Sequence, residues 1–430
     1  MNRQNPRQIA LRVLGRRRGG AGFTENLLER SLAKAKLQPP DRGLCQELAY
    51  GVIRWQATLD WLIARKIHGR EPKAALQNLL RLGLYQIFWL DKVPAHAAVH
   101  ETVELAKRGG LGPQAGLVNA ILRGYLREFD STRKALAGLK RTDPALGYSH
   151  PRWLVEKWRR HRDHERARRL LEWNNTPPKT FARVNTLKTD PGRLLNRWRE
   201  ENVEFGPVRR DWLEENPVFE LKSHPPLASL ESFRDGWFYI QDPSTLLAPI
   251  ELAPQSGETI LDLCAAPGGK TAFIAQLMNN QGKIVACDVS EERLKLLREN
   301  CRRLGATCVE AVLSSAFSLQ LSAFDRILVD APCSNTGVIR RRVDLRWRIS
   351  PAEILRLRKT QIKLLQLAAP KLKPGGVLVY STCSLEPEEN QEVVRDFLRG
   401  NQNFKLEFER ELLPFADRVD GAFVARLTKV

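Results

Sequence analysis

The sequence beyond Gln241 alternates short apolar stretches with longer amphipathic ones, and this alternation constrains the fold more than any other feature. Stretches typical of buried strands lie at residues 259–263, 283–287, 325–329 and 377–380, and residues 291–304 have the pattern of a helix. Strands that alternate with helices form a parallel sheet covered by helices. We therefore expect a Rossmann-like α/β domain at residues 241–430, with ligands bound beyond the carboxyl ends of its strands.

The sequence before this domain has a different character. Apolar residues recur at three- and four-residue spacing in 79–88 and 117–125, without strand-like alternation. This spacing predicts an all-α domain at residues 1–130, followed by a basic helical connector at residues 131–175. Short apolar stretches between polar loops then predict a small α+β subdomain at residues 176–240. The chain is thus expected to be multidomain, as its length of 430 residues also suggests.

Positive charge is concentrated in the first part of the chain. Residues 1–170 contain 33 Lys and Arg against 15 Asp and Glu, whereas the whole chain carries a net charge of +20. A field localised in this way attracts a polyanion, so nucleic acid is the expected partner. A membrane surface is disfavoured because no apolar face with Trp or Phe accompanies the arginines. Arg340, Arg341 and Arg342 either hold a target strand or form an exposed basic turn.

Hydropathy and cysteine usage narrow the class of protein further. No apolar run approaches the roughly 18 to 20 residues that span a bilayer, and the first residues lack an apolar signal core. The seven cysteines show no CxxC spacing, which favours reduced thiols over a disulfide framework or a zinc site. We expect a cytoplasmic protein without a metal site, and we favour a monomer.

A glycine-containing turn marks the expected cofactor site. Residues 261–271 run from an apolar strand into a helix, and Gly268 and Gly269 permit close approach to a ligand at the helix N-terminus. Cys264 stands where a phosphate-binding P-loop requires glycine, which disfavours an ATPase. Asp288 ends the next strand, where a carboxylate can accept hydrogen bonds from ribose hydroxyls. These positions predict a nucleoside-containing cofactor, and both NAD and S-adenosylmethionine fit them.

Two cysteines follow two of the expected strands, at the ligand-binding edge of the sheet. Cys333 comes three residues after Asp330, and Cys383 follows the last predicted strand. Methylation of cytosine C5 requires a thiolate that adds at C6, because C5 alone is a poor nucleophile. A carboxylic acid near ring N3 would stabilise the charge that moves into the ring, and Asp330 is placed to supply it. All seven histidines precede this domain, which disfavours a Cys-His hydrolase.

Taken together, these segments resemble the RsmB/NOP family of RNA cytosine-5 methyltransferases, and the helical part resembles the NusB-like RNA-binding domain. The matching segments in the catalytic part are Cys264 to Thr271, Asp330 to Ser334 and Thr382 to Ser384. Further matches are Arg183 to Leu187, Gln241 to Ser244, Asp420 to Phe423 and, in the helical part, Leu44 to Trp55, Leu79 to Phe88, Val93 to His96 and Val118 to Arg123. The resemblance covers almost the whole chain.

The resemblance implies a role for each matched residue. Cys383 would be the nucleophile that adds to C6, Cys333 would assist breakdown of the covalent adduct, and Asp330 would contact the cytosine ring close to the cofactor. The cofactor would be S-adenosylmethionine, held by the ribose acid Asp288, by Asp330 and by the loop residues Cys264, Ala265, Ala266, Pro267, Gly268, Gly269 and Lys270. The family usually has an Asp after the third strand; here residues 311–315 contain none, and Ser314 is a candidate substitute.

Together with these features, the resemblance implies an enzyme that methylates C5 of a specific cytosine in small-subunit (16S) rRNA through a Cys383–C6 adduct. One alternative is methylation of a cytosine in another RNA, either tRNA or large-subunit rRNA. A second is a catalytically inactive RNA-binding assembly factor. A third is a nicotinamide-dependent oxidoreductase.

Overall fold

The structure is a computed structural model that describes all residues except 1–4, 19–21, 68, 70, 214–216 and 315–322. The chain forms two compact units. The first, the helical unit, comprises Met1–Thr176 and also Ile339–Arg348. The second, the catalytic unit, comprises Pro177–Val338 and Ile349–Val430.

The helical unit contains no strand among its described residues, which confirms the predicted all-α fold. Its apolar stripes pack into one core, in which Leu48, Leu80 and Leu122 are fully buried. None of the helices in the described parts of the chain has the length and hydropathy needed to cross a membrane. The principal helices of the helical unit are α1 (Pro6–Arg18), α2 (Thr24–Ala33), α3 (Pro39–Arg54), α4 (Gln56–Lys66), α5 (Ala74–Trp89), α6 (Ala95–Arg108), α7 (Ala115–Arg127), α8 (Phe129–Thr142), α9 (Pro144–Gly147), α10 (Arg152–His161) and α11 (His164–Trp173).

Residues Ile339–Arg348, which we call the inserted segment, are far from the rest of the helical unit in sequence but fold as part of it. The guanidinium of Arg346 is fully buried and donates to the carbonyl oxygens of Arg54, Ser149 and Asn174 at 2.9 to 3.1 Å. Asp344 accepts a 2.6 Å hydrogen bond from the backbone N–H of Thr24. The inserted segment, which ends in the short helix α17 (Leu345–Arg348), is therefore anchored by its polar side chains.

The position of Arg340 in the inserted segment excludes the exposed basic turn that was one interpretation of the sequence. Arg340 does not lie in an exposed turn, since its side chain is 2% exposed and its guanidinium stacks 4.2 Å from the centroid of the Trp173 ring. Its planar cation packs well on an aromatic face once both are shielded from water. Arg342 is exposed.

The small α+β subdomain opens the catalytic unit, as predicted. Its four strands form an antiparallel sheet in the order β2–β3–β1–β4, and helix α12 packs on it through Trp198, which contacts Phe205, Phe219 and Phe238. The elements are β1 (Thr180–Val184), α12 (Pro191–Glu200), β2 (Glu204–Val208), β3 (Val218–Ser223), α13 (Glu231–Arg234) and β4 (Phe238–Ile240).

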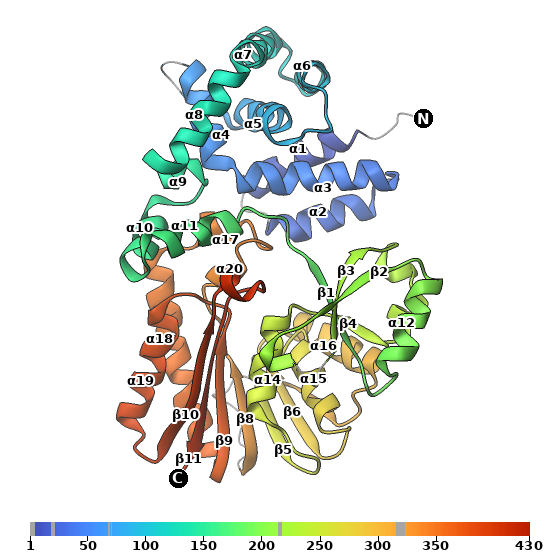
Figure 1. Cartoon of the computed structure of the whole chain (residues 1–430), viewed down its shortest axis with the longest axis vertical. Helices are drawn as coiled ribbons and strands as arrows, with labels where there is room; N and C mark the ends of the chain where they lie inside the picture. Colours follow the sequence, from blue (N-terminus) through green and yellow to red (C-terminus); the bar gives the residue numbers. More distant parts are fainter. Residues whose placement is uncertain (1–4, 19–21, 68, 70, 214–216, 315–322) are drawn as a thin grey trace. The chain divides into compact units, whose positions relative to one another are not determined.

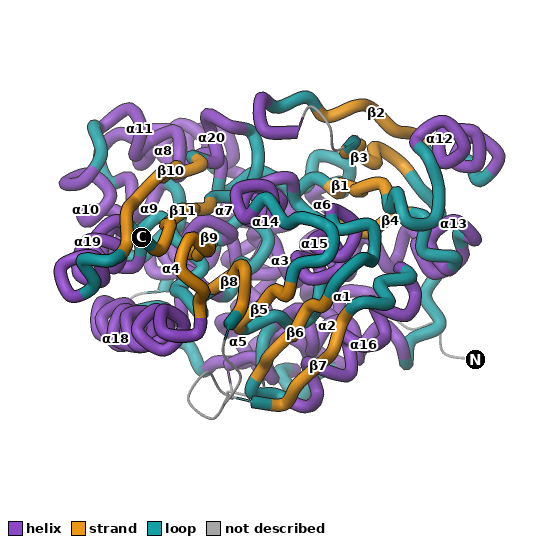
Figure 2. The backbone as a smooth tube through the Cα atoms, turned by 90° about the horizontal axis from the view of Figure 1, so that it is seen from below, coloured by secondary structure: helices purple, strands orange, loops and turns teal. Residues whose placement is uncertain are grey.

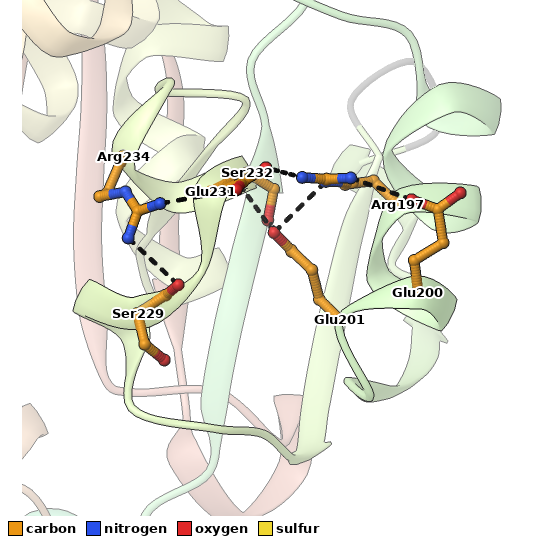
Figure 3. A network of polar contacts seen from close by, with 7 residues as sticks. All are labelled: Arg197, Glu200, Glu201, Ser229, Glu231, Ser232 and Arg234. Carbon is orange, nitrogen blue, oxygen red and sulfur yellow. Dashed lines mark hydrogen bonds and ion pairs between the residues drawn. The ribbon is translucent and has the colours of Figure 1, made fainter.

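A polar network ties α12 to α13 (Figure 3). Arg197 contacts the carboxylates of Glu200, Glu201 and Glu231, and the backbone N–H of Ser232 donates to Glu201 at 3.0 Å. These contacts pair the charges of this face within the subdomain. The network therefore serves the packing of the two helices.

The second part of the catalytic unit is built on a seven-stranded sheet in the order β10–β11–β9–β8–β5–β6–β7 (Figure 2). Strands β9, β8, β5, β6 and β7 pair in parallel, as predicted. The sheet as a whole is mixed, because β11, which was not among the predicted strands, pairs antiparallel with both β9 and β10. The strands are β5 (Thr259–Leu263), β6 (Lys283–Asp288), β7 (Val309–Leu313), β8 (Phe324–Asp330), β9 (Leu372–Thr382), β10 (Phe404–Leu412) and β11 (Ala422–Lys429).

Helices cover both faces of this sheet (Figures 1 and 2). Alternate residues of the strands enter two separate cores, as Ile260 and Leu261 illustrate on β5. The core on one face is completed by α14 (Leu247–Leu252), α15 (Gly269–Leu277) and α16 (Glu291–Leu304). The core on the other face is completed by α18 (Pro351–Ala368) and α19 (Gln391–Gly400).

Candidate active site

The predicted cofactor loop connects β5 to the N-terminus of α15. Cys264 and Gly268 both have positive φ, at 62° and 95°, so the chain turns sharply before the helix begins. A Cβ atom on Gly268 would lie 3.0 Å from Cγ of Leu297, and one on Gly269 would lie 2.9 Å from Cε1 of Tyr239. The two glycines therefore let the loop pack closely against α16 and β4. The first N–H groups of α15 remain directed at the end of the sheet.

Asp288 lies at the end of β6 and supports this loop. Its side chain is almost fully buried and accepts hydrogen bonds from the backbone N–H groups of Ala266 at 3.2 Å and Ser290 at 3.1 Å. The guanidinium of Arg293 lies 3.1 Å from the same carboxylate, and its side chain is half exposed. The carboxylate is thus fixed beside the loop, at the position expected for a ribose ligand.

Asp262, the last-but-one residue of β5, is a fully buried carboxyl behind the cofactor loop. Burial raises its pKa to about 7, although the hydroxyl of Thr271 donates to it at 2.6 Å and partly offsets this rise. Because Thr271 lies on α15, this hydrogen bond supports the first turn of the helix from behind the loop.

Lys270 joins the cofactor loop to the end of β8. Its ammonium lies 2.5 Å from the carboxylate of Asp330, which also accepts a 2.8 Å hydrogen bond from the hydroxyl of Ser381. Burial opposes the charge of Lys270, but Asp330 and the nearby Cys383 outweigh it and raise the pKa of the ammonium. The loop and both thiol-bearing strand ends therefore meet at this lysine.

The two predicted thiols lie side by side. The Sγ atoms of Cys333 and Cys383 are 3.3 Å apart, and Cys383 donates to Oδ1 of Asn335 at 3.0 Å. The Asn335 amide is oriented by its own 2.6 Å hydrogen bond to the carbonyl of Cys333. Because the Cys383 thiol already donates to Asn335, Cys333 is the donor within the thiol pair. The hydrogen bond with Cys383 and burial both raise the pKa of Cys333.

The register of the sheet accounts for this pairing. Strands β8 and β9 are adjacent and parallel, with Asp330 opposite Ser381. Cys333 is buried and Cys383 is partly exposed. Each thiol follows the carboxyl end of its strand by a few residues, so the parallel register brings both loops to one edge. The remaining cysteines lie elsewhere, and burial raises the pKa of Cys264, Cys287 and Cys301 to about 12.

Several contact residues were not among the sequence predictions. Asn335 and Ser381 touch the reactive groups directly. Asn335 lies two residues after Cys333, and this closeness in sequence could have marked it as a site residue. Its left-handed conformation, with φ 58°, could not be predicted from the sequence. No described group of three or more His, Cys, Asp or Glu residues could hold a metal ion. Ser314, the candidate substitute for the usual Asp after the third strand, donates its backbone N–H to the carbonyl oxygen of Asp288.

Three additional segments that match the family have structural roles. Arg183 is fully buried, donates to Gln241 at 3.1 Å and also contacts Gln276 of α15, which links the small subdomain to the cofactor helix. Asp242 accepts a 3.0 Å hydrogen bond from the backbone of Asp420. Burial lowers the pKa of Arg183 to about 9. These segments fix the framework around the site.

Three parts of the chain match known protein families. Residues 249–428 match the model described as 16S rRNA methyltransferase RsmB/F, residues 4–127 match the NusB family, and residues 150–211 match the RsmF/B-like ferredoxin-like domain. The chain is 36% identical over 455 residues to the probable ribosomal RNA small subunit methyltransferase B of Bacillus subtilis (strain 168), with 100% of each chain covered. The chain belongs to the RsmB/F methyltransferase family.

Solved structures agree with this assignment. The crystal structure of PH0851 matches with a TM-score of 0.80 and 26% identity, covering 99% of each chain. A methyltransferase homologue from Pyrococcus horikoshii matches with a TM-score of 0.59 and 34% identity, covering 67% of this chain and 98% of its own. Membership of the RsmB/F family settles the choice of cofactor that loop spacing left open: the chain is an S-adenosylmethionine-dependent methyltransferase, and the oxidoreductase alternative is wrong.

Proposed function

We propose that this methyltransferase modifies C5 of a cytosine in small-subunit rRNA, with Cys383 as the nucleophile. The observation that carries the proposal is the 3.3 Å approach of the Cys333 and Cys383 thiols, beside the Lys270–Asp330 pair at the cofactor loop. Methylation of an exocyclic amine or a ribose hydroxyl needs no thiol. Two adjacent thiols at the cofactor edge therefore favour the cytosine ring carbon as the acceptor.

The proposed reaction uses each thiol in turn. Cys383 gives its proton to the carboxylate of Asp330, which passes it to ring N3, and the sulfur adds to cytosine C6; the electron pair of the C5–C6 double bond moves toward N3 and makes C5 nucleophilic. After C5 has gained its methyl group, the C5 proton is removed and the C6–S bond breaks, which restores the double bond and frees Cys383. Water takes the C5 proton, and Cys333, kept protonated by its neighbours, donates its own proton to the Cys383 sulfur as the C6–S bond breaks.

Asp330 and Lys270 would serve the pyrimidine ring and the cofactor loop. Asp330, partly exposed beside the thiols, is the group we assign to ring N3, and Lys270 fixes its carboxylate. S-adenosylmethionine supplies the electrophilic methyl group when it is bound. The loop from Cys264 to Lys270 and the carboxylate of Asp288 would hold it, since a helix N-terminus and a buried acid at neighbouring strand ends suit a nucleoside with a carboxylate group.

Charge and kinship support RNA as the substrate. The helical unit carries most of the excess positive charge of the chain, and exposed arginines such as Arg159 and Arg160 project from α10. The B. subtilis relative is named for the ribosomal small subunit, and it matches over the full length of this chain. We therefore assign a cytosine of small-subunit rRNA, with tRNA and large-subunit rRNA as the alternatives that the experiment compares.

The test is release of tritium from RNA that carries [5-³H]cytidine. Methyl transfer to C5 displaces the hydrogen at that carbon, whereas transfer to N4 or to ribose does not. Unmodified small-subunit rRNA, large-subunit rRNA and tRNA are each incubated with the full chain and S-adenosylmethionine. We expect release from small-subunit rRNA alone. Methyl incorporation without tritium release would overturn C5 as the acceptor, and no incorporation into any RNA would favour an inactive assembly factor.

A further inference from the structure

A buried carboxylate of the catalytic unit connects the loops that carry the two thiols. Glu389, at the end of a short 3₁₀ helix after Cys383, is fully buried. Ser334 and Ser384, the residues that directly follow Cys333 and Cys383, both donate to it. The backbone N–H of Ser334 is 2.8 Å from Oε1, and the hydroxyl of Ser384 is 2.6 Å from Oε2. The hydroxyl of Ser334 also contacts Oε2.

The carboxylate is held from a third side by α18. The side-chain amide of Gln361 donates to Oε1 of Glu389 at 3.1 Å and to the carbonyl of Pro332 at 3.0 Å. The hydroxyl groups of Ser334 and Ser384 also lie 3.1 Å from each other. Burial raises the pKa of Glu389, while these donors oppose the rise. A buried carboxyl with this many donors is a costly group to retain for packing alone.

We propose that Glu389 is a positioning residue that clamps the loops after Cys333 and Cys383 together and thereby keeps the two thiols in contact. The value of that contact for catalysis rests on the proposed cytosine mechanism, but the contact itself does not. Each serine lies one residue from its thiol, so loss of the shared acceptor removes a tie next to both thiols at once. Misplacement of a reacting group by about 1 Å can cost roughly 100-fold in rate.

The two oxygens of Glu389 predict which substitutions are tolerated. Oε1 faces the backbone N–H of Ser334, which can only donate, whereas Oε2 faces hydroxyl groups that can rotate and accept instead. Glu389→Gln can place its amide oxygen at the first position and its NH₂ group at the second. Glu389→Asp is one methylene shorter and cannot reach both serines. Glu389→Ala leaves the buried donors unpaired.

The experiment measures thiol proximity without any methylation. The full chain is treated with dibromobimane, which becomes fluorescent when it joins two neighbouring thiols, and the Cys333–Cys383 product is identified by peptide mass mapping. We expect Glu389→Ala and Glu389→Asp to cross-link at least tenfold more slowly than the parent chain, and Glu389→Gln to stay within about threefold. Binding of S-adenosylmethionine to each variant reports that the cofactor side of the domain is folded.

A matched control separates positioning from general destabilisation. Glu258 is also a carboxylate near the sheet, paired with Arg326 at 2.6 Å, but it precedes β5 at the end opposite the thiols. Glu258→Ala should lower the melting temperature and leave the cross-linking rate unchanged. Cross-linking of Glu389→Ala at the parental rate would overturn the clamp. The clamp and the cytosine mechanism fail separately, because the tritium-release assay can be negative while the cross-linking result still holds.

Discussion

The backbone N–H of Gly337 donates a 2.9 Å hydrogen bond to the carbonyl oxygen of Cys383. This bond joins the loop after Cys333 to the proposed nucleophile itself. Gly337 in turn accepts a 2.9 Å bond from the N–H of Gly421, so three segments meet backbone to backbone. The segment from Asp420 to Phe423, which matched the family in sequence, thus supports the thiol site from the start of β11.

Gly337→Ala tests how closely this junction must be packed. A Cβ atom at position 337 would lie 2.6 Å from the carbonyl oxygen of Gly421 and 2.7 Å from that of Cys383, so the Cys383 backbone must move. We expect methylation to fall by about 100-fold while S-adenosylmethionine binding persists. Gly400→Ala is the control, since a Cβ there meets no atom within 4 Å. Single-turnover methyl transfer measures both, and an unaffected Gly337→Ala would show that the junction is not needed.

Asp262 predicts a pH dependence of stability. Its pKa is about 7 in the folded chain because of burial, against the ordinary 3.8, so the folded state holds its proton more tightly than the unfolded state. The stabilising contribution is therefore complete below about pH 4 and is lost as the pH rises to about 7, at roughly 1.4 kcal/mol per pH unit. Asp262→Asn cannot titrate. Relative to the parent, this variant should gain stability in urea unfolding between pH 5 and pH 8; a constant difference would contradict the assignment.

Arg346 predicts that the inserted segment is needed for the stability of the helical unit. Its buried guanidinium satisfies carbonyl oxygens of Arg54, Ser149 and Asn174. Arg346→Met removes those donors and should cost about 3 kcal/mol, seen as a lower melting temperature and faster proteolysis of the helical unit. The exposed Arg342 on the same segment provides the control, and Arg342→Met should change neither. Equal effects of the two substitutions would refute the anchoring role.

The basic face of the helical unit should make RNA affinity depend on salt. Each phosphate neutralised contributes about −0.7 to the log–log slope for single-stranded RNA. Loss of both exposed arginines in the Arg159→Ala, Arg160→Ala variant should flatten the slope by about 1.4 if each contacts a phosphate. Arg168→Ala serves as the control because Glu165 and Glu172 already pair with this arginine at 2.6 and 2.5 Å. Filter binding between 50 and 200 mM salt measures the slopes, and a flat response in the parent chain would remove phosphate contacts as the main anchor.

The sequence was a good guide to elements whose pattern is local. The strand at Thr259–Leu263 and the helix at Glu291–Leu304 lie where their apolar patterns predict, because buried parallel strands are continuous apolar runs and α16 has one apolar stripe. Strand β10 was not predicted because it lacks such a continuous apolar run: charged Glu407, Glu409 and Glu411 are interspersed with its apolar residues. This alternation is typical of a strand with one exposed face, as β10 is at the edge of the sheet.

The site was predictable where position along a strand decides the outcome. Cys333 and Cys383 follow neighbouring parallel strands, so their meeting could be expected from chain order alone. The burial of Glu389 and of Arg340 could not be predicted. In each case it depends on partners that are distant in sequence or on a fold that local patterns do not specify. A glutamate in the acidic stretch Glu386–Glu389 and an arginine in the basic stretch Arg340–Arg342 both look like exposed residues in a sequence.

The covalent step is the central claim, and trapping the protein–RNA adduct tests it most directly. Small-subunit rRNA is incubated with S-adenosylmethionine and the parent chain, Cys383→Ala or Cys333→Ala, and the products are separated on a denaturing gel. We predict no adduct and no methylation with Cys383→Ala. Cys333→Ala should accumulate a stable adduct because release is blocked after C6 attack. Normal methylation by Cys383→Ala, or an adduct formed without this thiol, would contradict the account.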